Sequence, residues 1–278
     1  MSERRRMGFI GGGNMARALI GGLIRAGYDP KQISVSDPLA PARDALAHDF
    51  SITTLVDNRQ LAAECDLLVL AVKPQAARPV IEDISAVFQA GHQTVVSIMA
   101  GIRATTIERW LGGQCAVVRA MPNTPALIGS GATGVFANTR VDPQGRQLAS
   151  ELFEAVGIIR WVDEERDLDS VTALSGSGPA YFFYLAELLE RAAVSQGLDP
   201  ESARALCVQT AIGAAQMLRD SGESAAALRG RVTSPGGTTH AAIETFRANG
   251  IEGIVELALE AARARSAELG RQFDQKPQ

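Results

Sequence analysis

Three consecutive glycines near the start of the chain restrict the folds it can adopt. They lie within GFIGGGNMARALIGGLIRAG, which begins at Gly8 and follows three arginines. A basic start before an apolar run is also typical of a secretion signal, but Asn14 and Arg17 interrupt the run. The same breaks exclude a membrane-spanning helix, which needs about 20 mostly apolar residues. The pattern instead predicts a strand at 7–10, a glycine turn and a helix at 15–25.

The turn matches the G-x-G-x-x-G/A pattern of dinucleotide-binding proteins through Gly11, Gly13 and Ala16. Gly11 permits the tight turn, Gly13 lets the backbone approach a pyrophosphate, and Ala16 lets the helix pack closely on the strand. The N–H groups that open the helix, where Asn14 and Met15 lie, are expected to bind the phosphates. We therefore expect NADPH or NADH as the cofactor. The alternative is an ordinary glycine-rich turn with no ligand.

The second predicted strand, at 33–37, ends in an acidic residue. Asp37 lies roughly where a ribose-binding carboxylate is expected after such a turn. A carboxylate there would accept hydrogen bonds from ribose hydroxyls and repel a 2′-phosphate, which favours NADH. The alternative is that Asp37 only caps the loop before Pro38.

Charge and composition exclude several functional classes. The net charge of −4 and the pI near 5.5 give no basic field for nucleic acid. The three cysteines are far apart and the three histidines are scattered, so we expect neither a disulfide framework nor a metal site. A cytoplasmic enzyme with no membrane contact is the resulting expectation.

The residue pattern changes near Asp163. Before it, apolar strand-like runs alternate with helical patterns, which predicts an α/β fold with a Rossmann-type doubly wound sheet. The expected strands after the first two are at 67–72, 94–98, 116–119, 134–137 and 157–162. After Asp163 the chain is rich in Ala and Leu and is expected to be all-helical. We place a dinucleotide-binding domain at 1–163 and a substrate and dimerisation domain at 164–278. Several helices of the second domain are apolar on more than one face, so we expect a homo-oligomer, at least a dimer, joined through this domain.

Three loops have compositions that suit a binding site. Ala71-Val72-Lys73-Pro74 follows a buried strand, at the edge of the sheet where open α/β folds bind ligands. Lys73 would direct its charge into that crevice, or would be an ordinary solvated lysine. Asn123 lies between two prolines in a rigid turn that suits either the wall of a cofactor pocket or a stiff crossover.

The third loop, Ser234-Pro235-Gly236-Gly237-Thr238-Thr239, lies between two predicted helices. Its glycines expose backbone N–H groups and the following helix presents its N-terminus, which together would hold a carboxylate. The alternative is that Thr238 or Thr239 only caps the helix.

Five motifs in this order and spacing, GFIGGGNMA, AVKP, RAMPNTPA, ALSGSGPAYFF and SPGGTT, resemble the pyrroline-5-carboxylate reductase family from Met7 to about Leu269. The resemblance implies a Rossmann domain, a helical dimerisation domain and reduction of 1-pyrroline-5-carboxylate to L-proline by NAD(P)H. It also implies that the glycine turn and the AVKP loop hold the dinucleotide. Asn58 falls where the family has an asparagine near the adenosine part.

The resemblance further implies that the SPGGTT loop holds the substrate carboxylate and that Thr239 bonds the ring nitrogen. Met99 and Ala100 lie in the predicted nicotinamide region, and Met99 replaces the small alanine usual in the family. Asp37-Pro38-Leu39 also lacks the Arg or Ser cluster that would accept a 2′-phosphate.

Two alternatives remain open. The β-hydroxyacid dehydrogenases share this architecture but use a lysine of the helical domain as an acid, and no lysine occurs here between Lys73 and Lys276. A dinucleotide sensor without turnover would not need the SPGGTT loop. For Lys73 the hypothesis is that it stabilises carboxylate or phosphate charge and is not the proton donor.

Overall fold

The computed structural model describes residues 5–274, so Lys276 and the ends of both predicted domains lie outside the described residues. It divides into two compact units, residues 5–177 together with 261–274, and Gly178–Glu260. The units therefore part at a different place from the predicted boundary after residue 163. The reason is local packing: α7 (Asp167–Val171) lies on the sheet, where a Cβ on Gly134 would be 2.5 Å from Val171 Cγ1.

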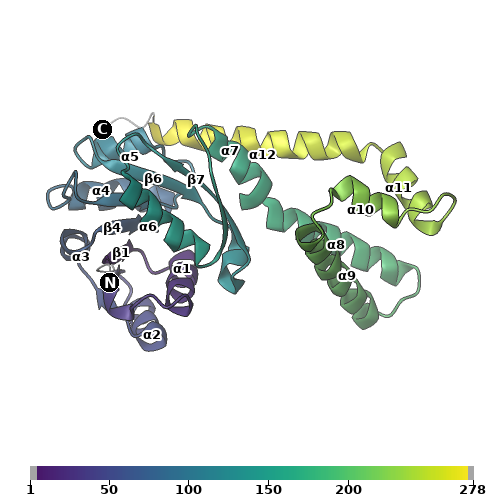
Figure 1. The fold of residues 1–278 in the computed structure, drawn as a ribbon, viewed down its shortest axis with the longest axis horizontal. Helices are drawn as coiled ribbons and strands as arrows, with labels where there is room; N and C mark the ends of the chain where they lie inside the picture. The colour runs from purple at the N-terminus through teal and green to yellow at the C-terminus, as the bar shows by residue number, and fades with distance from the viewer. Residues whose placement is uncertain (1–4, 275–278) are drawn as a thin grey trace. The chain divides into compact units, whose positions relative to one another are not determined.

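The first unit is built on an eight-stranded sheet of order β3-β2-β1-β4-β5-β6-β7-β8 (Figure 1). Neighbouring strands are parallel except β6 and β7, which pair antiparallel. This is the expected doubly wound arrangement, with the strand order reversing between β1 and β4. The strands are β1 (Met7–Ile10), β2 (Ile33–Ser36), β3 (Thr53–Leu55), β4 (Leu67–Leu70), β5 (Thr94–Ser97), β6 (Ala116–Met121), β7 (Gly131–Ala137) and β8 (Gly157–Trp161).

Both faces of the sheet are covered by helices, so its central strands are apolar on both sides. Alternate strand residues enter two different cores: Phe9 packs with Val96 and Val118, whereas Ile10 packs with Val95 and Val117. The first core is closed by α1 (Asn14–Arg25), α2 (Ala40–Phe50) and α6 (Pro143–Glu154). The second is closed by α3 (Asn58–Glu64), α4 (Ala77–Ile84) and α5 (Ala104–Trp110).

A buried group of charges ties three parts of the first unit together. Arg119 on β6 pairs with Glu165 at 2.9 Å, and Arg103 pairs with Asp169 of α7 at 2.9 Å. Ser266, in the last helix, donates to Asp169 Oδ1 at 2.7 Å. Burial lowers the pKa of Arg119, and the Glu165 carboxylate opposes that shift. This buried hydrogen bond attaches the end of the last helix to the sheet unit.

The second unit is all-helical, as expected, and has almost no core of its own. Among its described residues only Gly178, Ala203 and Leu228 are buried. Large apolar side chains are instead exposed, including Phe182 at 74 % and Leu257 at 73 %. Its elements are α8 (Gly178–Ser195), α9 (Pro200–Asp220), α10 (Ala225–Arg231), α11 (Thr238–Ala248) and the first part of α12 (Ile251–Asp274). Such a unit needs another surface to cover it. Within residues 5–274 no helix has the length and apolar character needed to cross a membrane.

Candidate active site

The glycine turn lies at the point where the strand order reverses. Gly11 follows β1, and its N–H donates to the Ser36 carbonyl at the end of β2 at 2.8 Å. Its φ is +99°, and an added Cβ would lie 2.8 Å from the Ala71 carbonyl oxygen beyond β4. A side chain is therefore excluded by both backbone conformation and space, as the sequence pattern predicts. Ligands of open α/β sheets bind at this edge.

Helix α1 begins at the turn with its first N–H groups free of side-chain caps. Gly13 is the N-cap residue and makes no side-chain bond, and no atom lies within 4 Å of the position a Cβ would occupy. Asn14 is exposed and Met15 is half-buried. A 12-residue helix that starts in open space next to glycine offers unpaired donors and the positive end of its dipole. These residues fit the pyrophosphate of a dinucleotide.

Asp37 holds the glycine turn in place. Its Oδ2 accepts the Gly12 N–H at 2.8 Å and its Oδ1 accepts the Leu39 N–H at 2.8 Å. The loop-capping alternative is thus present in the structure, and the bond to ribose stays a prediction. The Asp37 carbonyl accepts a bond from Arg43 Nη1 at 2.7 Å. Sequence reasoning missed Arg43, although it is an arginine in the first turns of the helix that follows β2.

Asn58 lies beside the same strand end. It is the first residue of α3, after the N-cap Asp57, and its Oδ1 accepts the Ser36 hydroxyl at 2.7 Å. The same Ser36 supplies the carbonyl that binds Gly11. Asn58 is therefore two hydrogen bonds away from the glycine turn, at the β2 side where the resemblance places the adenosine part.

The Ala71–Pro74 segment leaves β4 next to Gly11. Ala71 and Val72 are half-buried against the turn, whereas Lys73 is exposed and precedes a short 3-10 helix at Pro74–Ala76. The Lys73 ammonium has no hydrogen bond or ion pair within residues 5–274. An unpaired cation beside the strand ends is available to a bound anion.

The remaining predicted residues of this unit are mainly tied to the protein itself. Met99 is 2 % exposed and its side chain packs in the second core, whereas Ala100 is half-buried. Asn123 donates to the Ser175 carbonyl and accepts the Ala132 N–H, both at 2.9 Å. Asn123 therefore braces the turn, as the stiff-crossover interpretation predicts, and its cofactor contact stays a prediction.

The Ser234–Thr239 loop leads into α11 in the helical unit, and its two threonines are the first residues of that helix. Gly236 has a φ of +71°, and Gly237, not a threonine, is the N-cap residue and makes no side-chain bond. The interpretation that Thr238 or Thr239 only caps the helix is therefore wrong. Neither hydroxyl has a partner within residues 5–274, and Thr239 is half-buried. The loop presents free backbone donors and free hydroxyls together.

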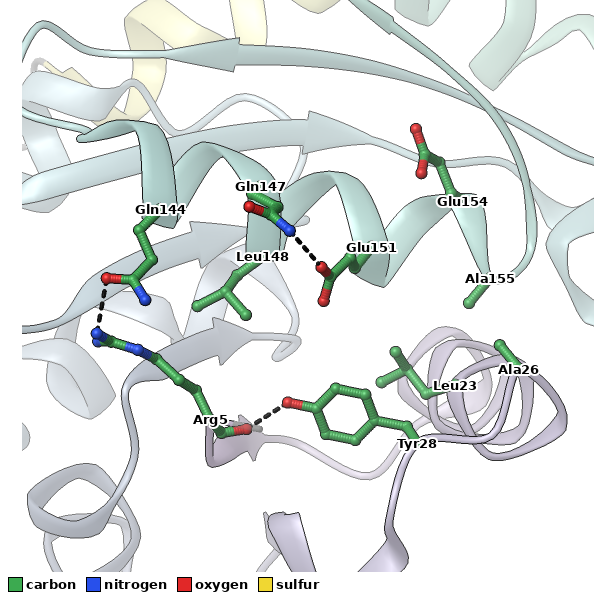
Figure 2. Close-up of a pocket in the computed structure, with 10 residues that line it drawn as sticks. All are labelled: Arg5, Leu23, Ala26, Tyr28, Gln144, Gln147, Leu148, Glu151, Glu154 and Ala155. Carbon is green, nitrogen blue, oxygen red and sulfur yellow. Dashed lines mark hydrogen bonds between the residues drawn. The ribbon is translucent and has the colours of Figure 1, made fainter. Parts of the chain in front are cut away.

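A cavity of about 550 Å³ lies elsewhere on the sheet unit. Figure 2 shows it between Arg5, the end of α1 and one side of α6. Its polar groups pair with each other: Arg5 Nη2 donates to Gln144 Oε1 at 2.6 Å, Gln147 donates to Glu151 at 3.0 Å, and the Tyr28 hydroxyl donates to the Arg5 carbonyl. Arg5 precedes β1, so the cavity is at the amino end of the strands, away from the glycine turn.

The structure thus brings the predicted dinucleotide-binding residues together at one edge of the sheet. Contacts join Gly11, Ser36 and Ala71, and through them Asp37 and Asn58. No group of three or more His, Cys, Asp or Glu within residues 5–274 could hold a metal ion.

Comparisons with known proteins agree with a dinucleotide-binding part followed by a helical dimerisation part. A family model described as pyrroline-5-carboxylate reductase dimerisation matches residues 165–269, and one described as NADP oxidoreductase coenzyme F420-dependent matches 6–101. The first match begins next to the domain boundary predicted after residue 163. It also agrees with the uncovered apolar helices of the second unit, and the chain forms a homo-oligomer through this domain.

Relatives and solved structures extend the agreement to the whole chain. Pyrroline-5-carboxylate reductase of Pseudomonas aeruginosa is 49 % identical over 97 % of this chain and 98 % of its own, and that of Vibrio alginolyticus is 41 % identical over 98 % and 100 %. The Coxiella burnetii enzyme structure superposes with a TM-score of 0.92 at 42 % identity, covering 95 % of this chain and 98 % of that one. The Plasmodium falciparum structure with NADP bound gives 0.84 at 30 % identity, covering 96 % and 99 %. The chain belongs to the pyrroline-5-carboxylate reductase family.

Proposed function

We propose that the two units divide the reduction of 1-pyrroline-5-carboxylate between them, the sheet unit binding NAD(P)H and the Ser234–Thr239 loop binding the substrate. The nicotinamide cofactor would supply a hydride to the imine carbon of a substrate that arrives protonated on its ring nitrogen, so that the carbon–nitrogen double bond becomes the C–N bond of L-proline and the cofactor leaves as NAD(P)⁺. Gly11, Gly13 and the start of α1 would hold the pyrophosphate, and Asn58 would lie at the adenosine part. Solved relatives include one with NADP bound, which supports this cofactor class.

The observation that carries the substrate assignment is the uncapped start of α11. The Gly237 N–H donates to the Ser234 carbonyl at 3.0 Å, but the N–H groups of Gly236, Thr238 and Thr239 have no protein partner within residues 5–274. The hydroxyls of Thr238 and Thr239 have none there either. A carboxylate satisfies such donors and is favoured by the helix dipole. The substrate has one carboxylate, and its ring N–H, when the imine is protonated, can donate to the Thr239 hydroxyl.

Imine reduction fits a chain whose helical unit has no lysine to act as an acid. A protonated imine is already electrophilic, so the protein needs mainly to orient the ring, an effect that can contribute up to about 7–11 kcal/mol. Carbonyl reduction would need an acid close to the developing oxyanion. No lysine occurs between Lys73 and Lys276, and His240 is the only histidine after residue 163. We assign Lys73 to stabilising bound negative charge, not to donating a proton.

The test follows nicotinamide absorbance with pyrroline-5-carboxylate in wild-type protein and two variants. Thr239→Val is expected to lower kcat by about 10-fold or more, as for loss of a hydrogen bond to a charged group, with a smaller change in KM. Lys73→Met is expected to lower kcat/KM. Thr245→Val, which removes a hydroxyl bonded only to the Ala241 carbonyl of the same helix, is the control. An unchanged kcat in Thr239→Val, or full efficiency in Lys73→Met, would remove that residue from the proposal.

A reducing compartment, as in the cytoplasm, is the proposed location. All three cysteines are free thiols, and Cys65 and Cys115 are buried in the sheet unit. Burial raises the pKa of Cys65 to about 12 and that of Cys115 to about 11. Reduced thiols buried in a core are typical of proteins that work in the cytosol.

A further inference from the structure

The last turns of α12 pack against the loop between β5 and α5, at 98–103, which we call the β5–α5 loop. A Cβ added to Gly101 of this loop would lie 3.2 Å from Leu269 Cβ, and one added to Gly270 would lie 3.2 Å from Arg103 Nε. Both distances are shorter than an ordinary van der Waals contact, so the two glycines permit the close approach of helix and loop. The helix therefore limits the positions that the loop can take.

A buried carboxylate joins the same helix and loop. Asp169 of α7 pairs through Oδ2 with Arg103 Nη2 at 2.9 Å, and its Oδ1 accepts the Ser266 hydroxyl at 2.7 Å. Its side chain is 12 % exposed and that of Arg103 is 20 % exposed. Because little water reaches these atoms, a lost hydrogen bond is poorly replaced by solvent. Asp169 therefore fixes the guanidinium of Arg103, and Ser266 fixes Asp169.

The far end of the β5–α5 loop is held by a second carboxylate. Arg103 is the N-cap residue of α5, and the next N–H, that of Ala104, donates to Glu165 Oε1 at 2.6 Å. The same oxygen accepts a hydrogen bond from Arg119 Nη1 at 2.9 Å. Arg119 lies on β6, so Glu165 ties the start of α5 to the sheet. Asp169 has the complementary position, since it ties the loop to α12.

The β5–α5 loop lies at the edge of the sheet where a dinucleotide binds. β5 is parallel to β4, and β4 to β1, so the three strands end at the same edge. In such folds the adenosine ribose lies at the end of the second strand, and the cofactor crosses the crevice where the strand order reverses. Its other half, which carries the nicotinamide, would then extend over the ends of β4 and β5. The β5–α5 loop would be next to the half of the cofactor that reacts.

We propose that Asp169 is a positioning residue for hydride transfer, fixing the β5–α5 loop through Arg103 and itself fixed by Ser266 of α12. The inference rests on the proposed function, because the position of the loop matters to the reaction only where a nicotinamide lies beside it. Asp169 is buried, so it acts through Arg103 and does not itself contact the cofactor. Hydride transfer depends steeply on the distance and angle between donor and acceptor, so a displaced loop slows the reaction more than it weakens binding of the adenosine half.

The first test measures binding without turnover. Wild-type protein, Ser266→Ala and Asp169→Asn are titrated with NADH or NADPH, whichever wild type binds more tightly, and with the matching ADP-ribose fragment, which lacks the nicotinamide. Both variants are expected to bind the fragment within about twofold of wild type and the whole cofactor about fivefold or more weakly. The control, Ser85→Ala, removes a hydroxyl bonded to the Glu82 carbonyl at the end of α4 and should match wild type with both ligands. A ratio of the two affinities that stays at the wild-type value in Ser266→Ala and Asp169→Asn overturns the proposal.

The second test separates positioning from general support of the fold. At saturating cofactor, Asp169→Asn should lower kcat by about 10- to 100-fold, while KM for pyrroline-5-carboxylate changes by less than about twofold. Arg103→Lys, which keeps a cation for Asp169, should retain more of the wild-type kcat than Arg103→Met. If the variants lose only thermal stability and keep the wild-type kcat, Asp169 supports the fold alone and the proposal is wrong. If wild-type protein oxidises neither cofactor, the proposed function fails, and the binding ratio still decides whether Asp169 positions the loop.

Discussion

Alanine in place of each of two glycines of the turn should separate folding from cofactor binding. At Gly11 the φ of +99° disfavours a side chain, and the new Cβ would meet the Ala71 carbonyl oxygen at 2.8 Å. Strain and overpacking together are expected to lower the free energy of unfolding by roughly 2–6 kcal/mol. At Gly13 the φ is −70° and a Cβ would meet nothing within 4 Å. The only expected cost is the poorer helix cap, about 1 kcal/mol or less.

Cofactor binding should distinguish the two variants in the opposite way from stability. Gly13 faces the space where a pyrophosphate would approach. Gly13→Ala should therefore weaken dinucleotide binding by about 10-fold or more without much change in stability. Gly11→Ala should lose stability even without ligand. Urea unfolding at fixed protein concentration measures the first effect, and titration with NADPH measures the second. The reasoning is refuted if Gly13→Ala binds NADPH as wild type does. It is equally refuted if the ligand-free Gly11→Ala protein is as stable as Gly13→Ala.

Three further predictions concern packing and assembly. Phe182→Glu places a charge on an apolar side chain that is 74 % exposed in one chain, and sedimentation should then show a smaller species than wild type. Glu165→Ala leaves the buried Arg119 without its ion-pair partner at 2.9 Å, and thermal unfolding should show a loss of about 3–5 kcal/mol; a change below about 1 kcal/mol would contradict it. Because burial raises the pKa of Cys65 to about 12 and of Cys115 to about 11, both thiols stay protonated at pH 8, and mass spectrometry after iodoacetamide should find them modified only in unfolded protein.

The sheet was predictable wherever its strands are buried on both faces. Runs such as Leu67–Leu70 have no polar residue, and the strands they form are fully buried between helices. The strand that the sequence analysis omitted, β3, is a three-residue edge strand that begins with exposed Thr53. An edge strand needs no apolar run, so its pattern does not differ from that of a loop. The β6 strand extends to Met121, two residues beyond the predicted strand at 116–119.

The glycine turn was predictable because it depends on backbone conformation, whereas the roles of polar side chains were not. Gly11 is specified by the absence of a Cβ, which the sequence states directly. For Asp37 and Asn123 the sequence left a ligand contact and a structural role both open. Both residues make backbone hydrogen bonds within the protein, and only the fold shows which N–H groups lie near them. Arg43 was missed for the same reason. Its bond to the Asp37 carbonyl depends on the angle at which α2 packs on the turn.

The exposed apolar side chains of the helical unit predict that assembly and catalysis are coupled in this chain. Phe182, Phe183 and Tyr184 are consecutive residues of α8, so they point to different faces of the helix, and each is at least 60 % exposed. One face packed within the same chain cannot cover all three, and each buried aromatic side chain contributes about 1.5–3 kcal/mol. A homo-oligomer supplies the missing surface, and the stability of the unit then depends on protein concentration. The Ser234–Thr239 loop belongs to this unit, so the geometry of the proposed substrate site depends on assembly as well as on its own residues.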